Sequence, residues 1–221
     1  MRSLGSEQSL QLFPPATWSG TDMTPTAPAD YPGMRPTGSW QLEPDGELRG
    51  LQTDGQGWSD RETGAAVDLA DRHLVLAYGS NPDVDKLLSQ PDFFDGQSVI
   101  ALRAAVIGWA AVWCDARRHR DGSVIATLMR MPGRVEVHPV LALTGHQLAT
   151  MDEWEGHPHS YYRATHSGVV VLENDQSLEA VDVYYGTSEK RPVLIVEGQA
   201  LLCTEIPHAV VDSMVARPAG W

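Results

Sequence analysis

The most informative stretch of this sequence reads Leu74-Val75-Leu76-Ala77-Tyr78-Gly79-Ser80-Asn81. Its apolar half is short and ends at Gly79, a pattern typical of a buried strand that leaves the core. Glycine also lets a ligand approach the main chain closely. Ser80, Asn81 and Pro82 then resemble a helix start, because small polar residues cap helices and proline fits the first turn. An ordinary strand–turn–helix would show the same pattern. The first N–H groups of a helix have no partner within the helix, so this predicted helix start would suit a carboxylate or a developing oxyanion.

A second informative stretch reads Leu148-Ala149-Thr150-Met151-Asp152-Glu153-Trp154-Glu155-Gly156. Thr144 before it is a good N-cap, and Gly156 suits the position just past a helix end. The pattern predicts a helix from residue 145 to 154 with Leu148 and Met151 facing inward. Glu155 would then lie at the end of this helix, while Glu153 would point to another face.

Together, the Tyr78-Gly79-Ser80-Asn81 loop and the Asp152-to-Gly156 motif resemble the γ-glutamyl cyclotransferase family. That family carries a Tyr-Gly-Ser-Asn loop, or a similar one, after its first strand and a Leu-Asp-x-x-Glu-Gly helix end further along. The resemblance covers residues 74–217, where Tyr161-Tyr162-Arg163 fits a Tyr-x-Arg segment and Ala180 to Tyr184 looks like a late strand. It implies an α+β fold, a small mixed β-barrel flanked by short helices.

The periodicity of the remaining chain also indicates many short strands and three or four short helices, as in an α+β fold. Pro139 departs from the family pattern, and because proline lacks a ladder N–H it predicts an edge strand or a bulge. The expected elements are a helix over 83–90, strands over 98–114, 124–131, 135–143, 169–172 and 179–185, a turn at 131–133, and a final helix pair from 191 that is broken at Ile206-Pro207.

Residues 1–70 differ from the rest because proline and glycine recur and no periodicity is sustained. We expect a flexible or loosely docked extension there, followed by the folded domain over residues 71–221. The extension also holds large aromatic residues, which disordered segments usually lack. These residues could anchor it to the domain or to a partner: Trp18, Tyr31, Trp40 and Trp58.

The chain has 221 residues and a formal net charge of −13, which argues against a nucleic-acid partner. The basic run Arg117-Arg118-His119-Arg120 is interpreted as a solvated hairpin tip, although a small anionic substrate could use one of its arginines. Cys114 and Cys203 are expected to be reduced core residues. No apolar leader or membrane-length run is evident, so a cytoplasmic protein without membrane contact is expected. The oligomeric state is left open.

The resemblance implies that the α-amine of a small γ-glutamyl substrate attacks its own γ-carbonyl, expelling an amine and forming 5-oxoproline. No metal or other cofactor is needed for this reaction. Glu155 matches the family's catalytic glutamate and would move the proton as general acid/base. The candidate substrate-binding residues are Tyr78, Gly79, Ser80 and Asn81, with Tyr161, Tyr162, Arg163 and Tyr184 as secondary candidates.

Three other interpretations remain open at this point. Ser80 could serve a hydrolase or acyltransferase, although it lies outside a Gly-x-Ser-x-Gly motif. His157 and His159, with other histidines nearby, could suggest a metal, but their spacing matches no standard zinc site. A binding module on the same fold could have lost turnover. The leaving amine is also open: an amino acid, a polyamine or lysine isopeptide, or a γ-glutamyl-protected biosynthetic intermediate.

Overall fold

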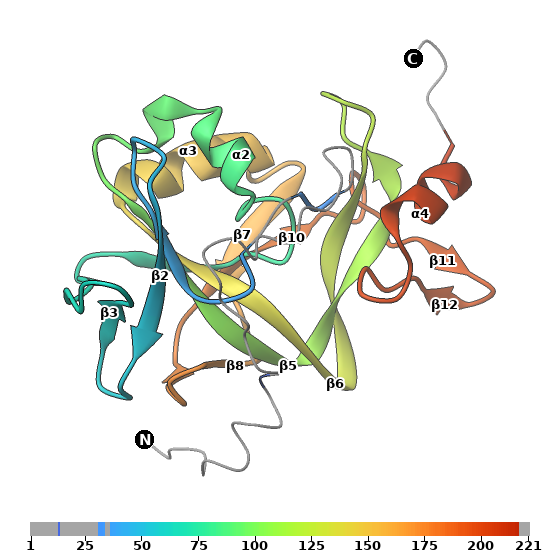
Figure 1. The fold of residues 1–221 in the computed structure, drawn as a ribbon. Coiled ribbons are helices and arrows are strands. Elements are labelled where there is room, and N and C mark those ends of the chain that lie inside the picture. The colour runs from blue at the N-terminus through green and yellow to red at the C-terminus, as the bar shows by residue number, and fades with distance from the viewer. Residues whose placement is uncertain (1–12, 14–30, 34–35, 217–221) are drawn as a thin grey trace.

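The framework of the fold is one long antiparallel hairpin (Figure 1). The computed structural model describes residues 13, 31–33 and 36–216. Strand β5 (Val99–Arg117) pairs with β6 (Val124–Leu143) from Ile100 opposite Ala142 to Arg117 opposite Val124. The shorter strands are β1 (Trp40–Leu42), β2 (Leu48–Thr53), β3 (Trp58–Asp60), β4 (His73–Leu76), β7 (Tyr161–Thr165), β8 (Val169–Leu172), β9 (Ser177–Leu178), β10 (Asp182–Gly186), β11 (Ile195–Val196) and β12 (Gln199–Ala200).

The main sheet is mixed, with the strand order β3-β2-β1-β5-β6-β4-β10-β7. Only β4 and β10 run parallel within this order; the other neighbours are antiparallel. The predicted α+β class is confirmed, but the barrel does not close, because β3 and β7 end the order without pairing to each other in the described residues. The same strand, β5, pairs with β1 at one end and with β8 further along, so the sheet branches.

Among the described residues, three short α-helices accompany this sheet. Helices α2 (Val84–Leu88) and α3 (Gly145–Glu155) lie together on one side, whereas α4 (His208–Met214) lies beside the β11–β12 hairpin (Figure 1). A 3-10 turn, η1 (Pro91–Phe93), follows α2. The predicted inward face of α3 is confirmed, because Leu148 and Met151 are buried in the core.

Residues 40–60 are part of the sheet, which corrects the expectation of a loosely docked extension up to residue 70. Trp40 is fully buried and lies opposite Ala101 of β5, and Leu42 is equally buried. Trp58 is buried in a second cluster on the other face. Burial of these large side chains is a strong driving force, so the aromatic residues rather than the Pro and Gly content decide the outcome. Trp18 lies outside the described residues.

The turn predicted at residues 131–133 is wrong, because β6 continues through it. The pairing shifts from Ile107 opposite Val135 to Trp109 opposite Arg130, so Gly108 faces several residues of β6. Gly108 and Gly133 have φ angles of 79° and 86°, which glycine tolerates. The Pro-Gly pair therefore forms an irregularity of the bulge type inside a strand, and not a chain reversal.

Pro139 lies in an interior strand, not at the edge or bulge that was expected. Its carbonyl oxygen accepts a hydrogen bond of 2.9 Å from the Ala77 N–H, on the side of β6 that faces β4. The missing proline N–H lies on that same side, since the N–H and C=O of one residue point the same way. The ladder between β4 and β6 therefore ends here, and the chain leaves the sheet at Tyr78.

Two helix predictions also need correction. The helix after β4 begins at Val84, because Asp83 and not Ser80 or Asn81 accepts the N-terminal hydrogen bonds. The predicted final helix pair is instead the β11–β12 hairpin followed by α4 alone. In the part of the chain that the structure describes, no helix has the length and apolar character needed to cross a membrane.

The complete burial of Trp40 predicts that β1 contributes to the stability of the fold. Trp40→Ala should lower the free energy of unfolding by about 3–5 kcal/mol, because it empties a large core volume. Gln52→Ala, at an exposed position of β2, is the matched control and should change it by less than about 0.5 kcal/mol. Urea denaturation measures both. A Trp40 variant as stable as its parent would contradict the assignment of β1 to the core.

Candidate active site

A cavity of about 340 Å³ lies where the chain leaves β4. It brings together most of the residues that the sequence singled out. The predicted residues that line it are Tyr78, Gly79, Ser80, Asn81, Glu155, Tyr161 and Tyr184. Other lining residues include Tyr31, Lys86, Arg118, His119, Arg120, Glu153, Trp154, Ser160 and Arg191.

Glu155 reaches this cavity because both ends of α3 are fixed. At its start, the side chain of Thr144 accepts from the Gln147 N–H, and the side-chain oxygen of Gln147 accepts from the Thr144 N–H. At its end, Gly156 adopts a left-handed conformation with φ of 61°. Glu155 is half-buried in the last turn, where the helix dipole disfavours a carboxylate. Glu153, expected on another face, is exposed but also borders the cavity.

Three tyrosines form walls of the cavity, and each donates its hydroxyl to another protein group. The Tyr78 hydroxyl donates to the Tyr184 carbonyl at 2.5 Å, and the Tyr161 hydroxyl donates to the Ala126 carbonyl at 2.8 Å. The Tyr184 hydroxyl donates to Asp152 Oδ1 at 2.7 Å. Burial raises the pKa of both Tyr78 and Tyr161 well above the usual value, so these phenols stay protonated.

Tyr162 and Arg163 lie outside this cavity. Side chains alternate along β7, so Tyr161 faces the cavity while Tyr162 is 45% exposed and borders a different hollow. The guanidinium of Arg163 pairs with Asp152 at 2.9 Å and with Asp182 at 2.7 Å. Arg163 therefore joins the end of α3 to the sheet, and the structure gives it a positioning role beside Tyr184.

The cavity is also lined by four cationic side chains that were not among the predicted site residues. Lys86 Nζ lies 2.8 Å from Asn81 Oδ1, and its burial lowers its pKa to about 8. An Arg118 nitrogen lies 3.4 Å from Ser80 Oγ. Arg120 and Arg191 complete the set. The run from Arg117 to Arg120 was the available signal: it lies at the predicted hairpin tip, where His119 and Arg120 are exposed, whereas Arg117 and Arg118 are partly buried.

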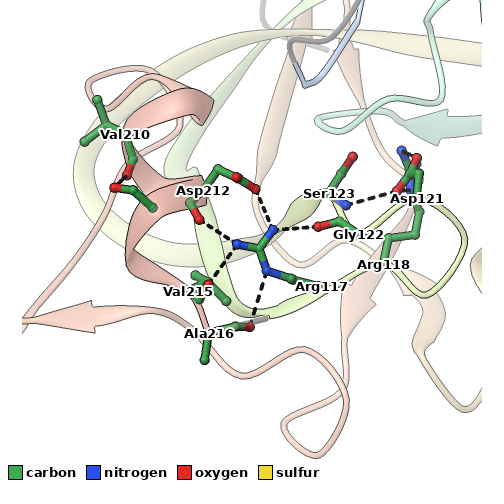
Figure 2. A network of polar contacts seen from close by, with 10 residues as sticks. Arg117, Arg118, Asp121, Gly122, Ser123, Val210, Asp212, Val215 and Ala216 are labelled. Carbon is green, nitrogen blue, oxygen red and sulfur yellow. Dashed lines mark hydrogen bonds and ion pairs between the residues drawn. The ribbon is translucent and has the colours of Figure 1, made fainter. Parts of the chain in front are cut away.

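Arg117 shows why this hairpin tip is held in place (Figure 2). Its buried guanidinium pairs with the Asp212 carboxylate and donates to the carbonyls of Asp212, Val215 and Gly122. Cationic side chains suit the free carbonyls at a helix C-terminus. The contacts join α4 to the β5–β6 tip, and Arg118 beside it is paired with Asp121. The tip that carries Arg118 and Arg120 is therefore anchored.

Of the histidines considered as metal ligands, His157, His146 and His166 have separate partners. His157 Nδ1 accepts from the Arg163 N–H, His146 Nε2 lies 2.9 Å from the Asp92 carbonyl oxygen, and His166 Nδ1 lies 2.8 Å from the Tyr185 hydroxyl. The described residues contain no group of three or more His, Cys, Asp or Glu side chains placed to hold a metal ion. Neither Cys114 nor Cys203 forms a disulfide.

No protein-family model and no curated protein matches the chain. Solved structures similar to it include one described as a gamma-glutamyl cyclotransferase, at 17% identity over 54% of this chain and 68% of that one, with a TM-score of 0.44. An AIG2-like protein from Mus musculus is 18% identical over 68% of this chain and 98% of that one, with a TM-score of 0.43. A protein from Arabidopsis thaliana is 22% identical over 59% of this chain and 78% of that one, with a TM-score of 0.43. Likeness this distant carries no inference about activity, which has to come from the site.

The polar contacts of Asp152 give a prediction about pH. Burial alone would raise its pKa, but the hydrogen bonds from Arg163 and Tyr184 bring it below the usual 3.8. Asp152 therefore stabilises the fold above pH 3.8, and this contribution disappears as the pH falls through the lower pKa of the folded state. Asp152→Asn should cost about 1–3 kcal/mol of unfolding free energy at pH 7 and progressively less in acid.

Urea denaturation of parent and variant across this pH range measures the effect. Asp85→Asn is the control, because Asp85 is an exposed carboxylate in the first turn of α2. We expect that variant to differ from the parent by less than about 0.5 kcal/mol. A constant difference between parent and Asp152→Asn at every pH would contradict the assigned ionised network.

Proposed function

We propose that this protein is a γ-glutamyl cyclotransferase that releases 5-oxoproline from a small γ-glutamyl compound. The observation that carries the proposal is that Glu155, at the end of α3, and the loop Gly79-Ser80-Asn81, which follows β4, line one cavity although they are far apart in the sequence. A carboxylate that moves a proton and a loop that binds the substrate are the two parts this reaction requires. The sequence motifs that carry these residues are the ones that resemble the family.

In the proposed reaction, a bond forms between the α-amine nitrogen and the γ-carbonyl carbon of the same glutamyl group. The bond from that carbon to the leaving nitrogen breaks. Glu155 accepts a proton from the attacking amine and returns it to the leaving amine, so no net proton, water or electron is consumed. Holding the substrate folded supplies up to about 7–11 kcal/mol, because the reacting groups are already in one molecule.

The loop at residues 79–81 has the second role in this proposal. Main-chain N–H groups that face the γ-carbonyl oxygen would stabilise the negative charge that develops on it. Loss of one such donor in other enzymes costs about 3–4 kcal/mol of transition-state stabilisation. Tyr78, Tyr161 and Tyr184 would form the apolar walls that keep water from the reacting centre, since their hydroxyls are already bonded to protein atoms.

The charge inside the cavity favours a substrate with carboxylates. The cavity is lined by four cationic side chains but only two carboxylates, those of Glu153 and Glu155. The cationic residues are Lys86, Arg118, Arg120 and Arg191. The chain as a whole is strongly acidic, which alone would favour a cationic leaving amine. Charges that line the cavity act at short range, whereas distant surface charges are screened beyond about 10 Å in salt solution. A γ-glutamyl amino acid therefore fits the proposed site better than a γ-glutamyl polyamine.

The Ser80 alternative is weaker on the same geometry. A serine nucleophile needs a neighbouring base to take its proton. The contact of the Ser80 hydroxyl comes from Arg118, which has donors but no acceptor and stays charged. We therefore assign Ser80 a binding role. The non-catalytic binding module differs from the proposal in a single respect, the absence of turnover, and the experiment below separates the two.

The test measures 5-oxoproline release from a panel of γ-glutamyl amino acids and amines without added metal. We expect release by the parent, with kcat lowered at least about 100-fold in Glu155→Gln. Glu179→Gln is the matched control, because Glu179 is exposed and does not line the cavity. Circular dichroism checks that the folds agree. An active Glu155→Gln would refute the assigned base, and a parent inactive on every compound would refute the proposed function.

A further inference from the structure

Tyr31 lines the cavity, although it comes from the Pro- and Gly-rich segment that the family resemblance does not cover. Its hydroxyl lies directly over the substrate-binding loop. A Cβ built on Gly79 would lie 2.7 Å from the Tyr31 hydroxyl oxygen, closer than ordinary contact. A side chain at position 79 would therefore have to displace the Tyr31 hydroxyl, which approaches the main chain closely at Gly79.

The position of Tyr31 is fixed from two sides. Its ring packs against Trp113 of β5 and His208 of α4, with ring centroids 5.4 and 6.0 Å apart. Two residues on, Gly33 has a φ of 94°, and a Cβ there would lie 1.9 Å from Asp83 Oδ2. Only glycine fits against the cap of α2 at that point. Residues 31–33 are thus docked against α2, α4 and the main hairpin.

The groups beside the Tyr31 hydroxyl share one chemistry. Ser80 and Arg118 line the same cavity as Tyr31 and contact each other, and Arg118 is close enough to Tyr31 for an electrostatic interaction. A phenol, an alcohol and a guanidinium all donate hydrogen bonds, and the guanidinium carries the positive charge that a carboxylate needs. The carboxylate of Asp121 pairs with Arg118 through other nitrogen atoms, which orients the guanidinium. Arg118 Nη1 is the nitrogen nearest to Ser80.

We propose that Tyr31, with Ser80 and Arg118, binds the α-carboxylate of the substrate's glutamyl group. The inference rests on the proposed function for the identity of that group. The α-amine and the α-carboxylate share one carbon atom, and the charges of Arg118 and Glu155 are close enough to interact, so a carboxylate held by Arg118 keeps the amine near Glu155. Tyr31 is then a specificity-determining residue that lies outside the part of the chain covered by the family resemblance.

The experiment compares two small probes that differ only in this carboxylate, 5-oxoproline and 2-pyrrolidinone. Calorimetry measures their binding to the full-length parent, to Tyr31→Phe and to the control Tyr185→Phe. The Phe substitution at position 31 keeps the ring that packs on Trp113 and removes the hydroxyl alone. Tyr185 is a matched control, because its hydroxyl contacts His166 and it does not line this cavity.

We expect the parent to bind 5-oxoproline at least about 10-fold more tightly than 2-pyrrolidinone, as a charge-assisted hydrogen-bonded contact would give. Tyr31→Phe should weaken 5-oxoproline about 10-fold and leave 2-pyrrolidinone unchanged, and Tyr185→Phe should change neither. Equal binding of the two probes by the parent would overturn the inference. So would no binding of 5-oxoproline, or a Tyr31→Phe variant that binds it as well as or better than the parent.

Turnover is a separate readout, so the two proposals can fail separately. Selective binding without 5-oxoproline release would refute the cyclotransferase and leave the carboxylate site intact. If the parent releases 5-oxoproline but Tyr31→Phe keeps the parent's preference for 5-oxoproline over 2-pyrrolidinone, the carboxylate site would be refuted and the cyclotransferase would stand. Thermal melting tests the contact itself without any ligand: Gly79→Ala should lower the Tm more in the parent than in Tyr31→Phe, where the hydroxyl that meets the new methyl group is gone. Equal losses would contradict the position assigned to Tyr31.

Discussion

The hydrogen bonds of Asp152 hold the arrangement together, because they join the last turn of α3 to the sheet. Asp152 accepts from Arg163 of β7 and from Tyr184 of β10, and Arg163 also pairs with Asp182. One of these partners, Tyr184, lines the cavity itself, and Glu155 follows three residues after Asp152. The acidic residue that resembles part of a catalytic motif is therefore structural, and its role is to place the end of α3 against the cavity.

The electrostatics of the molecule differ between its surface and its cavity. A chain with a net charge of −13 concentrates four cationic side chains around one hollow. Low-dielectric walls strengthen the field inside such a hollow, and the surrounding acidic surface does not cancel it at short range. The positive charge in the cavity depends on the tip of the β5–β6 hairpin, which carries Arg118 and Arg120. The contacts of Arg117 to α4 hold that tip in place.

The sequence predicted the parts of the fold that depend on local chemistry. The strand before Tyr78, and the helix between Thr144 and Gly156, follow from apolar periodicity and from cap residues whose contacts lie within a few positions. It also singled out the loop and Glu155, which meet in one cavity, because both belong to contiguous motifs. What it could not predict depends on contacts between distant segments. The burial of Trp40 requires β5, the buried setting of Arg117 requires α4, and the role of Gly108 appears only when β5 and β6 are paired.

Dependence on distant contacts also explains why Tyr162 was predicted to line the cavity and Tyr31 was not. Adjacent residues of a strand face opposite sides, so Tyr161 and Tyr162 cannot both line one cavity, but sequence alone does not tell which one does. Tyr31 had no motif around it, and its position over Gly79 depends on rings supplied by β5 and α4.

The central claim is that the substrate's own amine, and not water, attacks the γ-carbonyl. The most direct measurement is mass spectrometry of the products formed from a γ-glutamyl amino acid in water enriched in oxygen-18. The account predicts 5-oxoproline with no incorporated label, because every oxygen atom comes from the substrate. Glutamate that carries one labelled oxygen would show that water is the nucleophile, and it would contradict the account.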